Sequence, residues 1–148
     1  MSTKEIALAF AAKWQATDGE GLSALCTDDF LFSGPVPLPL GLSETIEWIS
    51  VLKHAAPDID YHQAHVQFEN GNIVHLITQV TGTHTGNLDL TDFGMGIIPP
   101  TGKSFSTPLE NAQVTIRDEK VTRYHVDPRP DAGILGMLAA LGITGAIA

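Results

Sequence analysis

Helix signals and strand signals occupy separate parts of this sequence, and this separation constrains the fold more than any other feature. The helix signals come first, from a capping box at Ser2 and Glu5 to a third segment at about 43–56, for which Ser43 is the expected cap. Asn70-Gly71 then predicts a β-hairpin. Strand patterns cover residues 61–68, 73–85, 104–116 and 121–126, and a short helix at about 132–141 closes the chain. This order predicts an α+β fold, in which three N-terminal helices pack on one face of a strongly curved, mostly antiparallel sheet.

Length and composition limit the class of protein. The chain has 148 residues with no repeat or linker, so residues 1–148 are predicted to form a single domain. Hydrophobic residues make up 43% and charged residues 17%, a globular composition. The net charge is −9 with only eight Lys and Arg, which makes nucleic acids and anionic membranes poor partners. The apolar tail at 134–148 is short and interrupted by glycine, so we expect it to dock on the body or on a partner subunit.

Cysteine and histidine usage predicts a cytoplasmic protein without a metal or a cofactor. Cys26 is the single cysteine, which excludes an internal disulfide, and the N-terminal segment lacks the pattern of a secretory signal. His62 and His65 are three apart in an expected strand, so they would face opposite ways and make a poor metal pair. The pair of glycines at 94 and 96 lacks the rest of a dinucleotide-binding fingerprint.

The segment 81–86, Thr-Gly-Thr-His-Thr-Gly, combines a histidine with two flanking glycines. In an extended chain Gly82, His84 and Gly86 share one face, and the glycines leave that face without side chains. The imidazole of His84 is therefore expected beside open space, at the rim or wall of a cavity. The alternative is a histidine at a strand end that hydrogen-bonds to backbone or solvent.

Five pieces of the sequence resemble the SnoaL-like polyketide cyclases, a family of the nuclear-transport-factor-2-like superfamily. They are Trp14 with Asp18, Phe30-Leu31-Phe32-Ser33-Gly34-Pro35, Ala56-Pro57-Asp58, the segment 81–86, and Asp131-Ala132-Gly133-Ile134-Leu135. The resemblance covers nearly the whole chain and implies a cone-shaped fold with a deep pocket. The superfamily contains cyclases, isomerases, epoxide hydrolases, dehydratases and non-catalytic binders, so the function has to be argued from the site.

The resemblance implies a catalytic carboxylate near the end of the last long strand. In the resembling cyclases an aspartate there acts as acid and base in an intramolecular aldol closure, without cofactor or metal. Asp127 is the first candidate, and His125 would lie beside it on a face shared with Val121 and Arg123. Asp131 is the rival, because the family's acid comes shortly before the C-terminal helix. Either aspartate has a structural alternative, as a strand exit for Asp127 and as a helix cap for Asp131.

Further candidates would complete a pocket for an apolar ligand. His84 would donate a hydrogen bond to a substrate carbonyl and stabilise the enolate. Glu110 falls on an otherwise apolar strand face, where it is either buried for a purpose or near an exposed edge. Several large side chains are expected to bind substrate, with plain core packing as the alternative: Trp14, Phe30, Phe32, Trp48, Met95 and Phe105.

Three functions follow from these candidates. The first is a cofactor-independent cyclase or isomerase that acts on an apolar, carbonyl-bearing, polyketide-like small molecule by acid/base catalysis. The second is an epoxide hydrolase or epoxide-opening cyclase, which needs a pair of carboxylates joined by an arginine. The third is a non-catalytic binding or dimerisation module. A homodimer is expected in each case, since the sheet leaves one face uncovered. The polar positions expected on that outer face are Gln63, His65, Gln67 and Gln79.

Overall fold

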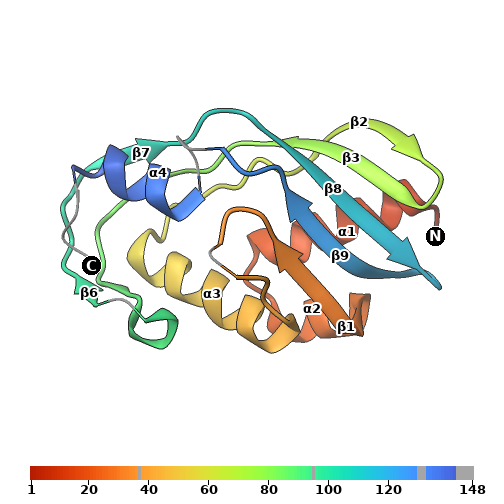
Figure 1. Ribbon diagram of the computed structural model, residues 1–148, viewed down its shortest axis with the longest axis horizontal. Helices are drawn as coiled ribbons and strands as arrows, with labels where there is room; N and C mark the ends of the chain where they lie inside the picture. The colour runs from red at the N-terminus through yellow and green to blue at the C-terminus, as the bar shows by residue number, and fades with distance from the viewer. Residues whose placement is uncertain (37, 95, 130–132, 143–148) are drawn as a thin grey trace.

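The helices and the long later strands follow the predicted order. The computed structural model describes the chain except residues 37, 95, 130–132 and 143–148 (Figure 1). The N-terminal part contains α1 (Thr3–Gln15), α2 (Gly19–Leu25), β1 (Cys26–Ser33) and α3 (Leu42–Ala55). The remainder contains β2 (His65–Asn70), β3 (Ile73–Thr78), β4 (Thr81–Thr83), β5 (Leu88–Asp89), the 3-10 helix η1 (Thr91–Phe93), β6 (Ile97–Ile98), β7 (Ser104–Ser106), β8 (Glu110–Arg117), β9 (Lys120–Val126) and α4 (Gly133–Ala140). Strand β1 lies among the N-terminal helices, and the short elements β5, η1 and β6 are additional.

Local side-chain hydrogen bonds explain where the helices begin. The predicted capping box at α1 is present, with Ser2 and Glu5 bonding each other's backbone amides. At α3 the predicted cap is wrong. Gly41 is the N-cap residue, because the Glu44 carboxylate accepts its N–H at 3.2 Å, and Ser43 lies inside the first turn.

The main sheet has five strands in the order β1-β9-β8-β3-β2. Its neighbours are antiparallel except β1 and β9, which run parallel because α3 and the later strands separate them in the chain. The predicted α+β fold with a mostly antiparallel sheet is therefore confirmed.

Two predicted strands are each broken into two, and this bends the sheet. Segment 73–85 becomes β3 and β4, and segment 104–116 becomes β7 and β8, with β4 paired to β7 in a separate ribbon. At the break the Val80 N–H donates to the Thr107 hydroxyl at 2.9 Å, and the Thr107 backbone N–H donates to the Val80 carbonyl at 2.9 Å. Pro108 follows without an amide to continue the ladder.

The two hairpin turns need residues with positive φ. Between β2 and β3 the two-residue loop is Gly71-Asn72, one position later than expected, because Asn70 pairs with Ile73 and only Gly71 has positive φ (62°). Between β8 and β9 both loop residues have positive φ, 52° at Asp118 and 63° at Glu119, as a type I′ turn requires.

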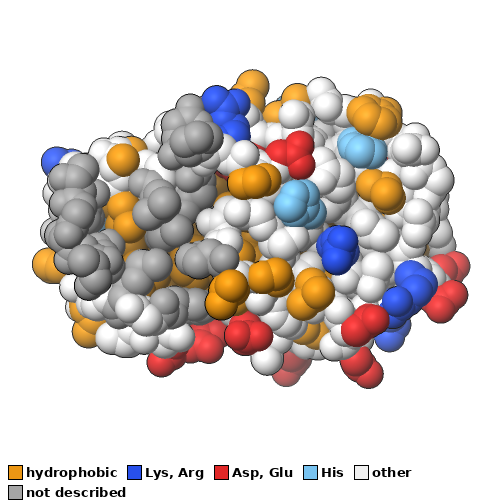
Figure 2. Space-filling view, viewed as in Figure 1, with side chains coloured by type: hydrophobic (Ala, Val, Ile, Leu, Met, Phe, Trp, Pro, Cys, Tyr) orange, Lys and Arg blue, Asp and Glu red, His pale blue; other side chains and the backbone are white. Residues whose placement is uncertain are grey.

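Helix α1 packs against the inner face of the sheet, and in Figure 1 strands β8 and β9 pass in front of it. The core between them is aromatic: the ring of Phe10 lies 5.4 Å from that of Tyr124, and the ring of Trp14 lies 5.0 Å from that of Phe32. The outer face carries polar side chains with scattered hydrophobic ones and histidines (Figure 2). Phe68 in β2 is 55% exposed and stacks on His75 in β3.

Within the described residues, no helix has the length and the apolar character needed to cross a membrane.

Candidate functional site

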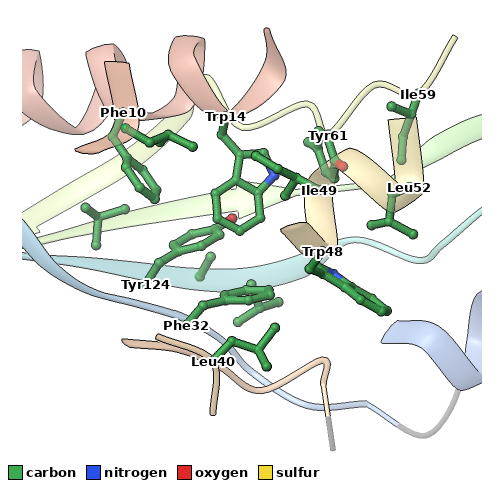
Figure 3. Close-up of a cluster of buried hydrophobic side chains, with 14 of the residues drawn as sticks. Phe10, Trp14, Phe32, Leu40, Trp48, Ile49, Leu52, Ile59, Tyr61 and Tyr124 are labelled. Atoms are coloured by element: carbon green, nitrogen blue, oxygen red, sulfur yellow. The ribbon is translucent and has the colours of Figure 1, made fainter. Parts of the chain in front are cut away.

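The main pocket lies between the inner face of the sheet and helices α3 and α4. The volume open to the centres of water-sized spheres is about 70 Å³. One water needs roughly 10–15 Å³ by this measure, so the space accommodates a small organic ligand. Figure 3 shows several of its aromatic residues converging on one region. The lining residues are Trp14, Phe32, Pro35, Trp48, Leu52, Tyr61, Gln63, Thr78, Val80, Thr107, Glu110, Tyr124, Val126 and Met137.

A buried polar cluster interrupts the apolar lining. The Thr78 hydroxyl donates to the backbone carbonyl of Tyr61, and the side-chain amide of Gln63 donates to the Tyr124 hydroxyl at 3.1 Å. Burial raises the pKa of Tyr124 to about 12, and the nearby negative charge of Glu110 acts in the same direction. The phenol of Tyr124 therefore stays protonated at neutral pH.

The segment that carries Tyr61 and Gln63 is held by α1. Gln15 at the end of that helix donates to the Ile59 carbonyl at 2.8 Å and accepts from the Tyr61 N–H at 2.9 Å. Between the two pocket residues, His62 has a positive φ of 48°, an uncommon conformation for a residue other than glycine. Backbone strain of this kind tends to occur where a site positions side chains.

Glu110 is the carboxylate of this pocket. It begins β8 opposite Thr78 and is 4% exposed. Glu110 is therefore buried in the pocket lining and does not lie at an exposed edge. Its neighbour Asn111 points to the other side and is exposed.

Asp127 and His125 do not line the pocket, and their predicted placement there is wrong. Tyr124 and Val126 face inward, so His125 and Asp127 face outward. The Asp127 side chain is 50% exposed and lies 3.6 Å from His125 Nε2. His125 Nδ1 is 2.8 Å from the Ser33 hydroxyl.

The prediction that Val121 and Arg123 lie on the same face of the strand is also wrong. A register shift at β8 pairs Val121 with Ile116, so Val121 turns inward and is fully buried, whereas Arg123 is exposed. Of the four side chains that could supply an epoxide hydrolase with its arginine and carboxylates, Asp127, Asp131, Arg123 and Arg129, Arg123 and Asp127 lie outside the lining of the pocket, and Asp131 lies outside the described residues.

His84 lies in a second, smaller cavity. It is 1% exposed, and burial lowers its pKa. The Thr101 N–H donates to His84 Nδ1 at 3.3 Å, which puts the proton of the neutral ring on Nε2. This cavity measures only about 10 Å³, enough for one water at most.

The glycines beside His84 are explained by close packing and do not create the expected open space, so His84 borders only the small cavity. A side chain at Gly82 would come within 2.9 Å of the Phe105 ring. At Gly86 it would come within 2.3 Å of the His54 carbonyl oxygen at the end of α3. Both positions need glycine because another group occupies the space of a Cβ.

The remaining candidates divide between the pocket and the core. Trp14, Phe32 and Trp48 line the main pocket, whereas Phe30 is fully buried in the core and Phe105 borders the cavity of His84. Met95 and Asp131 lie outside the described residues.

Sequence reasoning missed five polar residues of the pocket: Tyr61, Gln63, Thr78, Thr107 and Tyr124. Gln63 had been assigned to the outer face, but it is 5% exposed and lines the pocket. A signal existed for Tyr124, which alternates with Val126 in β9 as an inward residue would. Within the described part of the chain, no cluster of three or more His, Cys, Asp or Glu could hold a metal ion.

The comparisons with known proteins agree with this architecture. The sequence model of the SnoaL-like polyketide cyclase family matches residues 4–127. The chain therefore belongs to the SnoaL-like polyketide cyclase family. No curated protein matches it.

Solved structures show the same fold at low sequence identity. IdmH, a putative polyketide cyclase from Streptomyces antibioticus, is 18% identical with a TM-score of 0.69, covering 97% of this chain and 100% of that one. A putative SnoaL-like polyketide cyclase from Jannaschia sp. CCS1 is 18% identical with a TM-score of 0.65, covering 84% and 83%. A protein with a ketosteroid isomerase-like fold from Catenulispora acidiphila is 16% identical with a TM-score of 0.68, covering 95% and 94%. Such similarity shows the fold alone.

Proposed function

We propose that this protein is a cofactor-independent cyclase or isomerase that acts on an apolar, carbonyl-bearing, polyketide-like small molecule, with Glu110 as its acid and base. The observation that carries the proposal is the burial of this carboxylate in a mostly apolar pocket, near the protonated phenol of Tyr124. Family membership supports the class of reaction. The catalytic role predicted for Asp127 moves to Glu110, because Glu110 lines the pocket and Asp127 does not.

The reaction needs only a proton shuttle and a site for negative charge. The Glu110 carboxylate removes a proton from the carbon next to a carbonyl, and the electrons of that bond form an enolate. The O–H of Tyr61 and the N–H of Trp14, which line the same pocket, are the donors for the enolate oxygen. The enolate carbon attacks a second carbonyl of the same molecule, and the new alkoxide takes the proton back from Glu110. In this scheme the donor role predicted for His84 passes to Tyr61.

Proton exchange on a simple ketone tests the chemistry without knowledge of the natural substrate. The wild-type protein is incubated with 2-tetralone in D2O, and loss of the α-proton signals is followed by NMR. We expect exchange above the buffer rate, and a loss of at least about 100-fold in Glu110→Gln, the usual contribution of a general base.

Asp127→Asn is the matched control, because it also replaces a carboxylate by an amide near a strand end. We expect it to keep the wild-type exchange rate. Full exchange in Glu110→Gln, or loss confined to Asp127→Asn, would contradict the assignment. Binding of 2-tetralone without exchange in the wild-type protein would favour the non-catalytic alternative.

A further inference from the structure

Three polar atoms of residues that line the pocket lack partners among the described residues, the Trp14 N–H, the Tyr61 hydroxyl and Gln63 Oε1, and they define what a ligand must carry. Among the described residues, neither the Tyr61 hydroxyl nor Gln63 Oε1 makes a hydrogen bond, although both are buried. Each residue is 5% exposed and lines the main pocket. Unsatisfied buried polar groups cost free energy, so native proteins rarely keep them without a function.

A directional chain of hydrogen bonds fixes which atom of Gln63 faces the cavity. The Thr78 proton goes to the Tyr61 carbonyl, which leaves the Thr78 oxygen to accept. The Tyr124 hydroxyl is close to Thr78 and to the Glu110 carboxylate, and either of these takes its proton. The Tyr124 oxygen must then accept from Gln63 Nε2, so the carbonyl oxygen of Gln63, an acceptor, is the group of this lining residue that is left for a ligand.

Tyr61 presents the opposite property. Burial raises the pKa of its phenol, so its proton is retained, and the nearby Trp14 indole partly offsets this shift. By distance and angle neither the Tyr61 hydroxyl nor the Trp14 N–H makes a hydrogen bond among the described residues. Both groups can therefore donate to one ligand oxygen. Tyr61 and Gln63 are two residues apart on the segment that Gln15 holds, so donor and acceptor occupy fixed places.

We infer that the pocket selects a ligand of one or two rings that carries a carbonyl, bound by Tyr61, and a separate hydroxyl, bound by Gln63. A hydroxyaryl ketone is the simplest member of this class. A carbonyl and a hydroxyl in para positions cannot hydrogen-bond to each other within the ligand, so both remain available to Tyr61 and Gln63. The inference rests on the proposed function only in taking this pocket as the substrate site, and it is tested by binding alone.

Four one-ring probes of matched shape separate the two contacts. The probe 4-hydroxyacetophenone carries both the carbonyl and the hydroxyl. Acetophenone carries only the carbonyl, 4-ethylphenol carries only the hydroxyl, and ethylbenzene carries neither. Affinity is measured by calorimetry near neutral pH. We expect each group to strengthen binding to the wild-type protein about fivefold to tenfold, the value of a net hydrogen bond of about 1 to 1.4 kcal/mol.

Two variants assign each preference to its residue. Tyr61→Phe should lose the preference for the carbonyl and keep that for the hydroxyl, and Gln63→Met should do the reverse. Gln67→Met, on the exposed side of β2, is the control and should bind all four probes as the wild-type protein does.

The wild-type series decides the inference even if a variant fails to fold. Equal affinities for the four probes, or no binding of any probe, would overturn it. A carbonyl preference that persists in Tyr61→Phe would overturn the assignment to that residue. If the preferences are present and 2-tetralone exchange is absent, the proposed function fails and this inference stands. The opposite result rejects this inference alone.

Discussion

The inner and outer faces of the sheet place two carboxylates in opposite environments a short distance apart. Glu110 begins β8 on the inner face and is 4% exposed, whereas Asp127 follows β9 on the outer face with a side chain that is 50% exposed. The strands adjoin there, because the Asp127 N–H donates to the Asn111 carbonyl at 2.8 Å. A single step in the alternation of a strand therefore decides which acid faces the pocket.

The largest contrast in stability is expected between neighbours on β1. Phe32 is 3% exposed and packs on Trp14 and Tyr124, whereas Leu31 on the outer face is 38% exposed. Phe32→Ala should lower the free energy of unfolding by about 3 to 5 kcal/mol, the cost of a large buried truncation. Leu31→Ala should cost less than about 1 kcal/mol. Urea unfolding measures both, and equal losses would erase the distinction between the faces.

The next largest effect is expected at alkaline pH, where the buried phenol of Tyr124 on the inner face should make the free energy of unfolding depend on pH. The Tyr124 phenol ionises at about 10 when unfolded, and burial raises its pKa to about 12. Its contribution is fully present below pH 10 and is lost as the pH rises toward 12, at about 1.4 kcal/mol per pH unit. Urea titrations at stepped pH should show this slope, and Tyr124→Phe should reduce it to the part that Tyr61 contributes. An unchanged slope in that variant would contradict the assignment.

A smaller contrast is expected between two threonines. Thr78 on the inner face is 4% exposed and donates to the Tyr61 carbonyl, whereas Thr115 is half-buried on the outer face. Thr78→Val leaves that carbonyl with only the Gln79 N–H as donor, at 3.3 Å, and should cost about 0.5 to 1.5 kcal/mol in urea unfolding, the net value of one hydrogen bond. Thr115→Val should stay within about 0.5 kcal/mol of the wild-type protein. A Thr78→Val protein of wild-type stability would show that the buried chain of hydrogen bonds does not stabilise the fold.

The smallest effect on the folded chain is expected at Phe68. It is 55% exposed and stacks on His75 with ring centroids 4.2 Å apart. Phe68→Lys should change the free energy of unfolding by no more than about 0.5 kcal/mol. If the predicted homodimer pairs through this face, sedimentation should show the variant as a monomer under conditions where the wild-type protein is a dimer. A dimer in both proteins would move the interface elsewhere.

Much of the fold was predictable because its determinants are local. Ser2 and Glu5 cap α1 within one turn, and the 118–119 turn closes its hairpin through the φ angles of two residues. The aromatic lining was partly predictable too, since Trp14, Phe32 and Trp48 reach the pocket. The carboxylate that lines the pocket was not predictable, because the sequence does not show which of Asp127 and Glu110 lies on the inner face.

Taken by itself, the sequence determined the order of helices and strands, the α+β class and the family resemblance, because propensities, caps and turns act over a few residues. Only the tertiary structure decided which side chains lie on the inner face of the sheet. The register shift that turns Val121 inward and the Gln15 clamp that holds the segment of Gln63 both depend on residues distant in the chain. Burial of a polar group depends on all the elements packed around it, so the pocket of Glu110, Tyr61 and Gln63 appears only when the sheet has closed over α1 and α3.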